Sequence, residues 1–263
     1  PGNLPRRLDL AIDLTALDRV VSHSPADLTG TFQAGMTLAG LQRVLSEQGQ
    51  FLPLDPPLPD KATIGGTLAA GVSGPLKWQF GNPRDLVIGM KIVQADGAVV
   101  KSGGQVVKNV SGYDMARLHI GGLGSLGVIA EVSLKLMPLP RNERTMLASF
   151  DSGLYCGQAS MSVLHSHVPP LALTSYDGRV MDRAGLPGLT GTRWLAIRLG
   201  GRPRTLERLT REATRLCEDG GASSIETLEG ADAADFWRKL ADFGWRPEDA
   251  IGVAVRFSVP PSN

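Results

Sequence analysis

The chain has 263 residues, of which 42% are apolar, so it can bury a sizeable core and is long enough for two domains. No apolar run approaches the roughly 18 residues that a spanning helix needs, and we therefore expect no transmembrane segment. Its 27 Lys and Arg residues against 26 Asp and Glu give a net charge of +1, which provides no electrostatic basis for binding nucleic acid or an anionic membrane.

The two cysteines, Cys156 and Cys217, stand alone without CxxC spacing. This usage is typical of a reducing compartment and excludes an iron-sulfur cluster built from the chain's own thiolates, so we expect a cytoplasmic protein. The sequence begins with Pro1 rather than Met and stops soon after an apparent strand, which is typical of a fragment.

The first half of the chain mixes short strands, one helix and glycine-containing loops. Strands are expected at residues 8–14, 18–23 and 28–34. The helix expected from Leu38 to Gln48 carries apolar residues at helical spacing, and Gly49 stands where a C-terminal cap belongs. Residues 85–94 and 98–103 flank Asp96-Gly97, which predicts a β-hairpin with a two-residue turn because both turn positions tolerate positive φ.

A first glycine segment, residues 62–71, reads ATIGGTLAAG. Thr63 is placed to cap a helix whose first amides would emerge at Gly65 and Gly66, and free amides at a helix start attract negative charge. A diphosphate would suit these amides, and so would the N1/C2-carbonyl edge of a flavin. Alternatively, the two glycines only allow the helix start to pack closely against another helix.

A second glycine segment, residues 121–129, reads GGLGSLGVI and leads into a strand-like stretch. A Rossmann GxGxxG fingerprint instead opens a helix, so nicotinamide binding of that type is disfavoured. Taken singly, this segment would also be explained by structural glycines at a tight bend. The two segments lie about sixty positions apart, and together they predict a cradle in which backbone amides contact a nucleotide cofactor.

Pro138 and Pro140 follow the strand expected to end near Met137. They predict a linker at residues 138–143 between a domain at residues 1–137 and a second domain at residues 144–263. In the second domain, strands are expected at residues 145–150, 171–176, 193–199, 223–227 and 251–259, and helices at residues 154–165, 205–219 and 233–243. This alternation predicts helices on an antiparallel sheet.

Three patterns in the second domain favour structural roles. The pair His165 and His167 is too small a ligand set for a metal ion, so no metal site is expected. The arginines of the helix at residues 205–219 form a solvated face opposite an apolar stripe. A cluster of aromatic residues is expected to pack in the core, with contact to a partner subunit as the alternative. Its members are Phe236, Trp237, Phe243 and Trp245.

The stretches ATIGGTLAAGVSG, FGNPRDLVIGMKIV, KNVSGYD and LHIGGLGSLGVIAEV resemble flavoproteins of the vanillyl-alcohol oxidase or PCMH type, which bind FAD. The resemblance spans Leu8 to Leu136 and is closest to the E-subunit branch of bacterial glycolate oxidases. It implies an α+β fold: a two-lobed PCMH-type FAD-binding domain with its N-terminal lobe truncated, then a smaller α+β domain of the FAD-linked oxidase type. By that resemblance, the flavin would be lined mostly through backbone contacts by Pro56, Thr63, Ile64, Gly65, Gly66, Gly71, Ser73, Gly74, Gly124, Ser125, Gly127, Val128 and Ile129.

The sequence departs from the family pattern at two places. Leu123 stands where the family usually has a glutamate, as also tends to hold in the E-subunit branch. The RGGGT-type loop that wraps the diphosphate in the family would lie upstream of Pro1. Either the chain is truncated or half of the diphosphate contacts are lost.

The resemblance implies an FAD-dependent oxidoreductase subunit of a glycolate oxidase complex. A catalytic flavoprotein subunit would oxidise a small 2-hydroxy acid to a 2-oxo acid, and an iron-sulfur subunit would accept the electrons. The assembly would be cytoplasmic, or peripheral to a membrane through its partners. No catalytic residue is assigned. Two alternatives stay open: a free-standing flavin-dependent hydroxy-acid oxidase, for which Arg84, Lys108 and Tyr113 are candidate groups, and a non-catalytic structural subunit with a degenerate flavin site.

Overall fold

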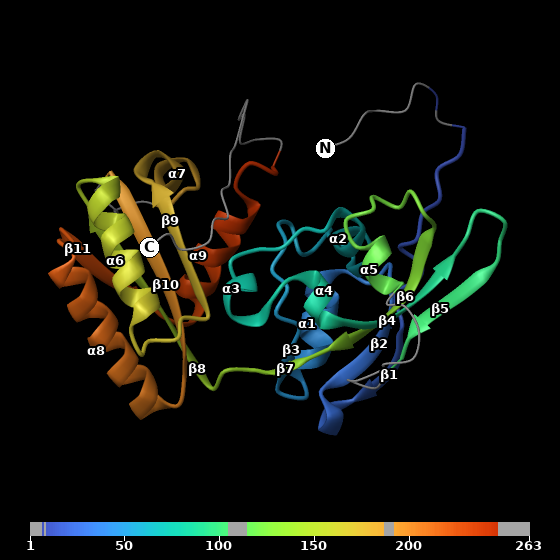
Figure 1. Ribbon diagram of the computed structural model, residues 1–263, viewed down its shortest axis with the longest axis horizontal. Coiled ribbons are helices and arrows are strands. Elements are labelled where there is room, and N and C mark those ends of the chain that lie inside the picture. Colours follow the sequence, from blue (N-terminus) through green and yellow to red (C-terminus); the bar gives the residue numbers. More distant parts are fainter. Residues whose placement is uncertain (1–6, 8, 105–114, 187–191, 247–263) are drawn as a thin grey trace.

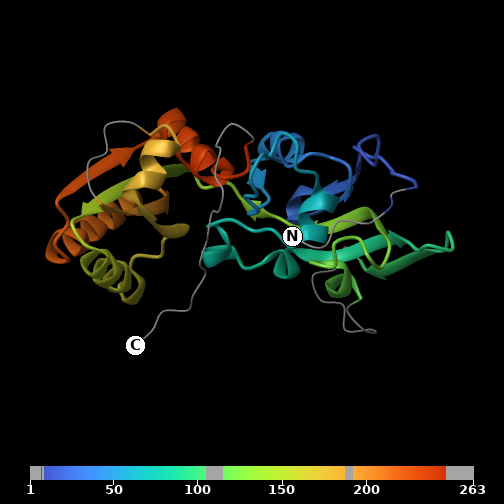
Figure 2. The same cartoon turned by 90° about the horizontal axis from the view of Figure 1, so that it is seen from above.

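The computed structural model describes residues 7, 9–104, 115–186 and 192–246. They form two lobes side by side, each with its own antiparallel sheet (Figures 1 and 2). The first lobe holds the sheet β1-β2-β6-β4-β5, and the second holds the sheet β11-β8-β10-β9. The expected division into an FAD-binding domain, a linker and a second domain stays a prediction, but each lobe has its own buried apolar clusters.

The strands of the first lobe are β1 (Val20–Ser24), β2 (Thr29–Gln33), β4 (Val87–Val93), β5 (Val99–Gly103) and β6 (Val128–Lys135). A small sheet pairs β3 (Gln50–Phe51) with β7 (Met137–Pro138). The strand expected at residues 8–14 is wrong for its described part, residues 9–14, which form no strand. Leu10 and Ile12 are largely exposed there, so the apolar side of the alternating pattern is not buried against the sheet, and the sheet ends at β1.

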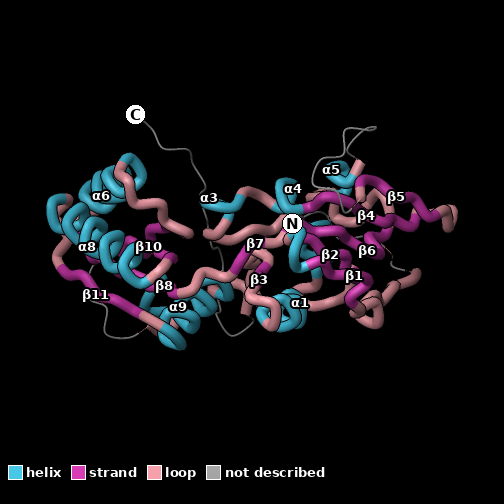
Figure 3. The backbone as a smooth tube through the Cα atoms, turned by 90° about the horizontal axis from the view of Figure 1, so that it is seen from below, coloured by secondary structure: helices cyan, strands magenta, loops and turns pink. Residues whose placement is uncertain are grey.

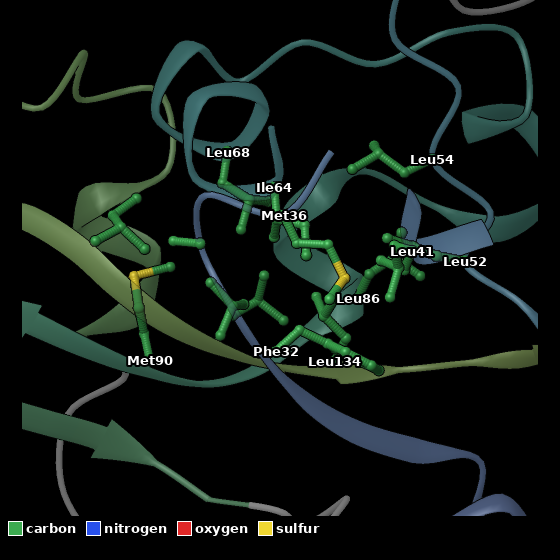
Figure 4. Packing of buried hydrophobic residues seen from close by; sticks show 14 of the residues in the cluster. Phe32, Met36, Leu41, Leu52, Leu54, Ile64, Leu68, Leu86, Met90 and Leu134 are labelled. Carbon is green, nitrogen blue, oxygen red and sulfur yellow. The ribbon is translucent and has the colours of Figure 1, made fainter. Parts of the chain in front are cut away.

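Helices cover one face of the first sheet. They are α1 (Leu38–Ser46), α2 (Ile64–Ala70), α4 (Pro83–Leu86) and α5 (Ala116–His119). The short helix α3 (Lys77–Phe80) contacts β9 of the second lobe instead, and a 3-10 turn η1 (Pro25–Asp27) joins β1 to β2. Figure 4 shows Leu41 of α1 and Ile64 and Leu68 of α2 packed with Phe32 and Leu134 of the sheet. The opposite face carries polar pairs, such as Lys91 with Glu131. This division between an apolar and a polar face is typical of an antiparallel sheet.

The hairpin of β4 and β5 is confirmed, but its turn differs from the expected one. The amide of Gln94 donates to the carbonyl of Ala98 at 2.9 Å, and the amide of Gly97 donates to the carbonyl of Gln94 at 3.0 Å. Only Gly97 has positive φ, at 84°. These bonds describe a three-residue loop with a bulge, which places one more residue in the turn than the Asp-Gly signal predicted.

The second sheet contains β8 (Asn142–Phe150), β9 (Ala172–Asp177), β10 (Arg193–Gly201) and β11 (Ser224–Leu228). Its helices are α6 (Gly153–His165), α7 (Gly178–Arg183), α8 (Pro203–Asp219) and α9 (Gly230–Asp242). These assignments confirm the expected elements apart from α7, which was missed, and the strand at residues 251–259, which lies outside the described residues.

Helices cover both faces of this second sheet, as Figures 1 and 3 show. Met146 and Phe150 of β8 pack with α6 and α8, whereas Leu147 between them packs with Phe236 of α9. Successive residues of β8 therefore belong to two different clusters on opposite faces of the sheet, and the residues on both faces must be apolar. Of the aromatic cluster, Phe236, Trp237 and Phe243 pack against the core as expected, while Trp245 is half exposed.

Little chain separates the lobes, because β7 ends at Pro138 and β8 begins at Asn142. Half of the expected linker, residues 138–143, thus belongs to strands, and residues 139–141 alone join the two elements. A second connection comes from α9, where Asp242 accepts a hydrogen bond from the amide of Leu58 in the first lobe.

Candidate functional site

The first glycine segment forms the start of α2. Thr63 caps the helix as expected, accepting a bond from the amide of Gly66 at 3.1 Å. The expectation that Gly65 and Gly66 offer free amides is wrong, because the amide of Gly65 donates to the carbonyl of Ala34 at 2.7 Å. A Cβ on Gly65 would lie 2.9 Å from the Cβ of Ala34, so this glycine permits close packing. The backbone amides of Gly65 and Gly66 at the start of α2 are therefore hydrogen-bonded within the protein.

The two glycine segments meet at the C-terminal end of α2. The amide of Gly121 donates to the carbonyl of Leu68 at 2.9 Å, and the amide of Leu123 donates to the carbonyl of Ala69 at 2.8 Å. Gly71 ends the helix with φ of 65°, and a Cβ there would lie 3.2 Å from the Cα of Gly121. The two segments are therefore in contact in the folded chain, and their convergence on one nucleotide cofactor stays a prediction.

The close approach at Gly71 can be tested against a glycine of the same conformation. Gly49 has φ of 64° but open space where a Cβ would stand. We expect Gly49→Ala to cost about 1 kcal/mol of unfolding free energy, and Gly71→Ala about 1 to 2 kcal/mol more because the two backbones must separate. Urea unfolding of both variants measures the difference. Equal midpoints would mean that the Gly71 contact with Gly121 tolerates a methyl group.

The second glycine segment is the more open of the two. A shallow hollow above it is lined by His119, Gly122, Gly124, Leu126, Gly127 and Ile129. Gly121 and Gly124 both have empty space where a Cβ would stand. Across the described ranges, the amides of Gly124 and Leu126 have no hydrogen-bond acceptor. Backbone donors that could meet a ligand therefore lie on this loop rather than at the start of α2.

Leu123 in this loop has φ of 52°, which is rare for a side chain branched at Cγ, and its side chain is more than half exposed. Strained backbone of this kind persists where surrounding contacts hold it, here the bond to Ala69. The bond to Ala69 thus ties the strained residue of this loop to the end of α2.

The predicted lining residues Pro56, Ser73 and Gly74 come from two segments that approach each other closely at Asp55 and Gly74. A Cβ on Gly74 would lie 2.3 Å from the carbonyl oxygen of Asp55 and 2.4 Å from its Oδ1. The amide of Leu76 donates to Asp55 Oδ2 at 3.1 Å. Asp55 Oδ1 is buried and has no hydrogen-bond partner among the residues that the structure describes. No local sequence pattern indicates this burial, because it depends on a segment nearly twenty residues later.

Burial raises the pKa of Asp55 from 3.8 to about 6, while the bond from Leu76 and the charge of Arg198 lower it less. The folded chain thus binds this proton more tightly than the unfolded chain. Protonated Asp55 therefore contributes to the free energy of unfolding in full below pH 3.8, and this contribution is lost as the pH rises through about 6.

We expect Asp55→Asn, which mimics the protonated side chain, to raise the free energy of unfolding at pH 7.5 by about 2 to 3 kcal/mol. The gain should shrink as the pH falls towards 4. Urea unfolding of the FAD-free chain at several pH values measures it, with Asp60→Asn on the exposed surface as control. An Asn variant that is no more stable than the parent at pH 7.5 would contradict this reasoning.

The structure places the other expected lining residues in different settings. Ile64 and Ile129 have buried side chains in the core of the first lobe, so a ligand would meet only their backbone. Of the candidate catalytic groups, Arg84 lies exposed on α4, while Lys108 and Tyr113 fall outside the described residues. The amide and carbonyl of Val128 belong to β6.

Of the two histidines of the second lobe, His167 borders a hollow of about 340 Å³, which is also lined by Trp78, Leu164, Ser166 and residues 168–170. His165 itself ends α6. In the described part of the chain, no three His, Cys, Asp or Glu side chains are grouped as a metal site would require. Burial raises the pKa of Cys217 to about 12, which keeps this thiol protonated.

Comparison with known proteins identifies relatives. Residues 4–103 match the family described as FAD binding domain. The chain is 28% identical over 239 residues to glycolate oxidase subunit GlcD of Bacillus subtilis, covering 89% of this chain and 51% of that protein. It is 39% identical over 131 residues to glycolate oxidase subunit GlcE of Escherichia coli, covering 49% of this chain and 37% of that protein.

Other relatives include a mitochondrial D-lactate dehydrogenase [cytochrome] of Arabidopsis thaliana, 31% identical over 212 residues, covering 80% of this chain and 36% of that protein. A solved structure of alkyldihydroxyacetonephosphate synthase superposes with a TM-score of 0.71 at 19% identity, covering 88% of this chain and 48% of that one. That likeness shows the fold alone. The chain spans about half the length, or less, of these curated relatives.

Proposed function

We propose that this chain, whose residues 4–103 match the FAD binding domain family, is the FAD-binding subunit of a glycolate oxidase or dehydrogenase complex. In this proposal a catalytic flavoprotein subunit oxidises a small 2-hydroxy acid to the 2-oxo acid, and an iron-sulfur subunit takes the electrons. The 39% identity to a GlcE subunit over half of the chain supports the assignment to the E type.

The observation that carries the proposal is the junction of the two glycine segments. Gly71 and Gly121 lie in contact, and the loop that follows presents a hollow, open space at Gly124 and unpaired amides. Such a surface fits the flat, polar edge of a flavin, because backbone can approach the ring where side chains are absent. The residues of α2, the Pro56 turn and this loop would form the walls.

When bound, FAD would accept the two electrons that leave the hydroxy acid, since the redox chemistry belongs to the cofactor. The chain's own contribution would be to orient the ring and to place amide donors beside it. Exposed amides at Gly124 and Leu126 would favour the anionic, reduced form of the ring at its pyrimidine edge. The satisfied amides of Gly65 and Gly66 would contribute shape rather than charge.

A second candidate is a free-standing flavin-dependent hydroxy-acid oxidase. It is favoured by the longer alignments with GlcD and with the D-lactate dehydrogenase, which include most of the second lobe. This function would need a base and a carboxylate-binding arginine facing the ring. The third alternative, a structural subunit with a degenerate flavin site, would need neither.

An absorbance spectrum of the purified chain after incubation with FAD and gel filtration tests the proposal. A retained flavin spectrum is expected, and bleaching by glycolate is expected only when the partner subunits are added. Bleaching by glycolate without partners would favour the free-standing enzyme. Absence of any bound flavin would favour the structural subunit.

The cellular location follows from the same proposal. The described residues contain no helix with both the length and the apolar character to span a bilayer. We propose a cytoplasmic location, with contact to a membrane only through partner subunits.

A further inference from the structure

A buried carboxylate joins the second lobe to a turn in the first. Asp242, at the end of α9, is 7% exposed, and no other Asp or Glu residue within the described ranges is buried to this degree. Its Oδ1 accepts a hydrogen bond from the amide of Leu58 at 2.7 Å, across 184 residues of sequence. A hydrogen bond to an ionised group is stronger than one between neutral groups, and losing it leaves the partly buried amide of Leu58 without this acceptor.

Leu58 adopts a conformation that needs such support. Its φ is 52°, in the left-handed region that costs a leucine about 1 to 2 kcal/mol. Its carbonyl accepts bonds from the amides of Lys61 and Ala62, both at 2.8 Å. Both backbone groups of Leu58 are therefore engaged, and the bond from the second lobe is the one that comes from outside the turn.

The turn lies between two positions expected to line the flavin. Pro56 comes two residues earlier and Thr63, the cap of α2, five residues later. The carbonyls of Pro59 and Ala62 accept bonds from the amides of Ala39 and Leu38 in α1. Proline fixes φ, and Pro56 and Pro57 are both buried, so little slack remains to absorb a movement of Leu58.

The second lobe also acts on the start of the same turn. The positive charge of Arg198 on β10 lowers the pKa of Asp55. Arg198 is itself held by Glu143, at 2.6 Å. We call residues 55–63 the lobe-contact turn. The second lobe interacts with this turn at Asp55, through the charge of Arg198, and at Leu58, through the hydrogen bond to Asp242.

We propose that Asp242 is a positioning residue for the flavin site. Because Asp242 accepts the hydrogen bond from the amide of Leu58, the packing of the second lobe determines the shape of the lobe-contact turn. This turn then determines the shape of the wall beside the flavin. This inference rests on the proposed function for its flavin. The bond itself does not depend on that function, so the two can be tested separately.

The test uses the full chain with three variants. Asp242→Ala removes the acceptor, and Asp242→Asn keeps a neutral oxygen that can accept the same bond. Asp235→Ala, on the same helix, removes an exposed carboxylate that pairs with Arg238 and Lys239 and serves as the control. The readouts are amide hydrogen exchange of a peptide containing Leu58, FAD affinity by titration, and the visible circular dichroism of the bound flavin.

We expect Asp242→Ala to speed exchange at Leu58, to weaken FAD binding about tenfold and to change the dichroism of the flavin. Asp242→Asn should restore most of each signal, and Asp235→Ala should match the parent. If Asp242→Ala does not fold, Asp242→Asn decides alone, because its neutral oxygen accepts a weaker bond: exchange slightly faster and FAD binding slightly weaker than in the parent support the inference, and parental values overturn it.

Unchanged exchange at Leu58 in Asp242→Ala overturns the inference. Faster exchange with parental affinity and parental dichroism also overturns it, because the turn would then not reach the cofactor. A parent chain that binds no FAD overturns the proposed function instead. In that case faster exchange in Asp242→Ala still supports the contact between the lobes, and unchanged exchange rejects it.

Discussion

The substitution Gly127→Ala is expected to lower the free energy of unfolding by about 3 to 5 kcal/mol and to prevent retention of FAD. Gly127 has φ of 144°, a region that residues with a side chain rarely adopt. A Cβ there would also lie 2.7 Å from Cγ2 of Ile92 and 3.0 Å from the carbonyl oxygen of Val93. Ile92 is buried and branched at Cβ, so neither neighbour can move aside without disturbing β4.

The matched control is Gly124→Ala in the same loop. Gly124 also has positive φ, 72°, but no atom within 4 Å of the added methyl group. Its substitution should cost about 1 kcal/mol, which reflects backbone conformation alone. Chemical unfolding and the flavin content after gel filtration measure both variants. Similar stability losses at the two positions would show that the contact with β4 is not what requires glycine.

Truncation of Trp194 to alanine is expected to destabilise the second lobe by about 3 to 5 kcal/mol. Trp194 on β10 is fully buried in the cluster that it shares with Leu147, Phe236 and Leu240. Removing its side chain would leave a large cavity between the sheet and α9. Because the first lobe has a separate core, its unfolding transition should move much less, and calorimetry can resolve the two.

Trp194→Phe provides the comparison. The indole Nε1 of Trp194 is buried and has no hydrogen-bond partner in the described part of the molecule. Replacing the indole by a phenyl ring removes this unsatisfied donor and keeps most of the packing, so its cost should be well below that of alanine. If Trp194→Ala and Trp194→Phe each lower the transition of the first lobe as much as that of the second, the lobes unfold as one unit. The proposed division into domains would then need revision.

Sequence patterns predicted the second lobe well because its signals are local. The stripe of Leu206, Leu209 and Ala213 on α8 is buried as the helical spacing requires. Arg215 lies on the outer face and pairs with Glu212 and Asp219. Such patterns reflect neighbouring residues on one element, and a single sequence contains them in full.

The errors arose where distant residues decide the outcome. Residues 9–14 alternate like a strand, but no neighbouring strand accepts them. The amide of Gly65 would be free in an isolated helix, yet it donates to Ala34, thirty-one residues earlier. Asp55 is buried by the segment at Gly74 and Leu76. The convergence of the two glycine segments was inferred from their pairing and from the resemblance to flavoproteins, because neither segment taken singly indicates it.

The pairing order of the first sheet has a consequence for the route to the native state. Thr31 on β2 faces Ser133 on β6, 102 residues later, and β4 lies on the other side of β6. The central strand is therefore the last of the five to be synthesised, and a nascent chain must leave β2 and β4 apart until it emerges. Because closing such long loops is entropically slow, we expect the first lobe to acquire its structure later than the more locally connected second lobe, although it comes first in the sequence.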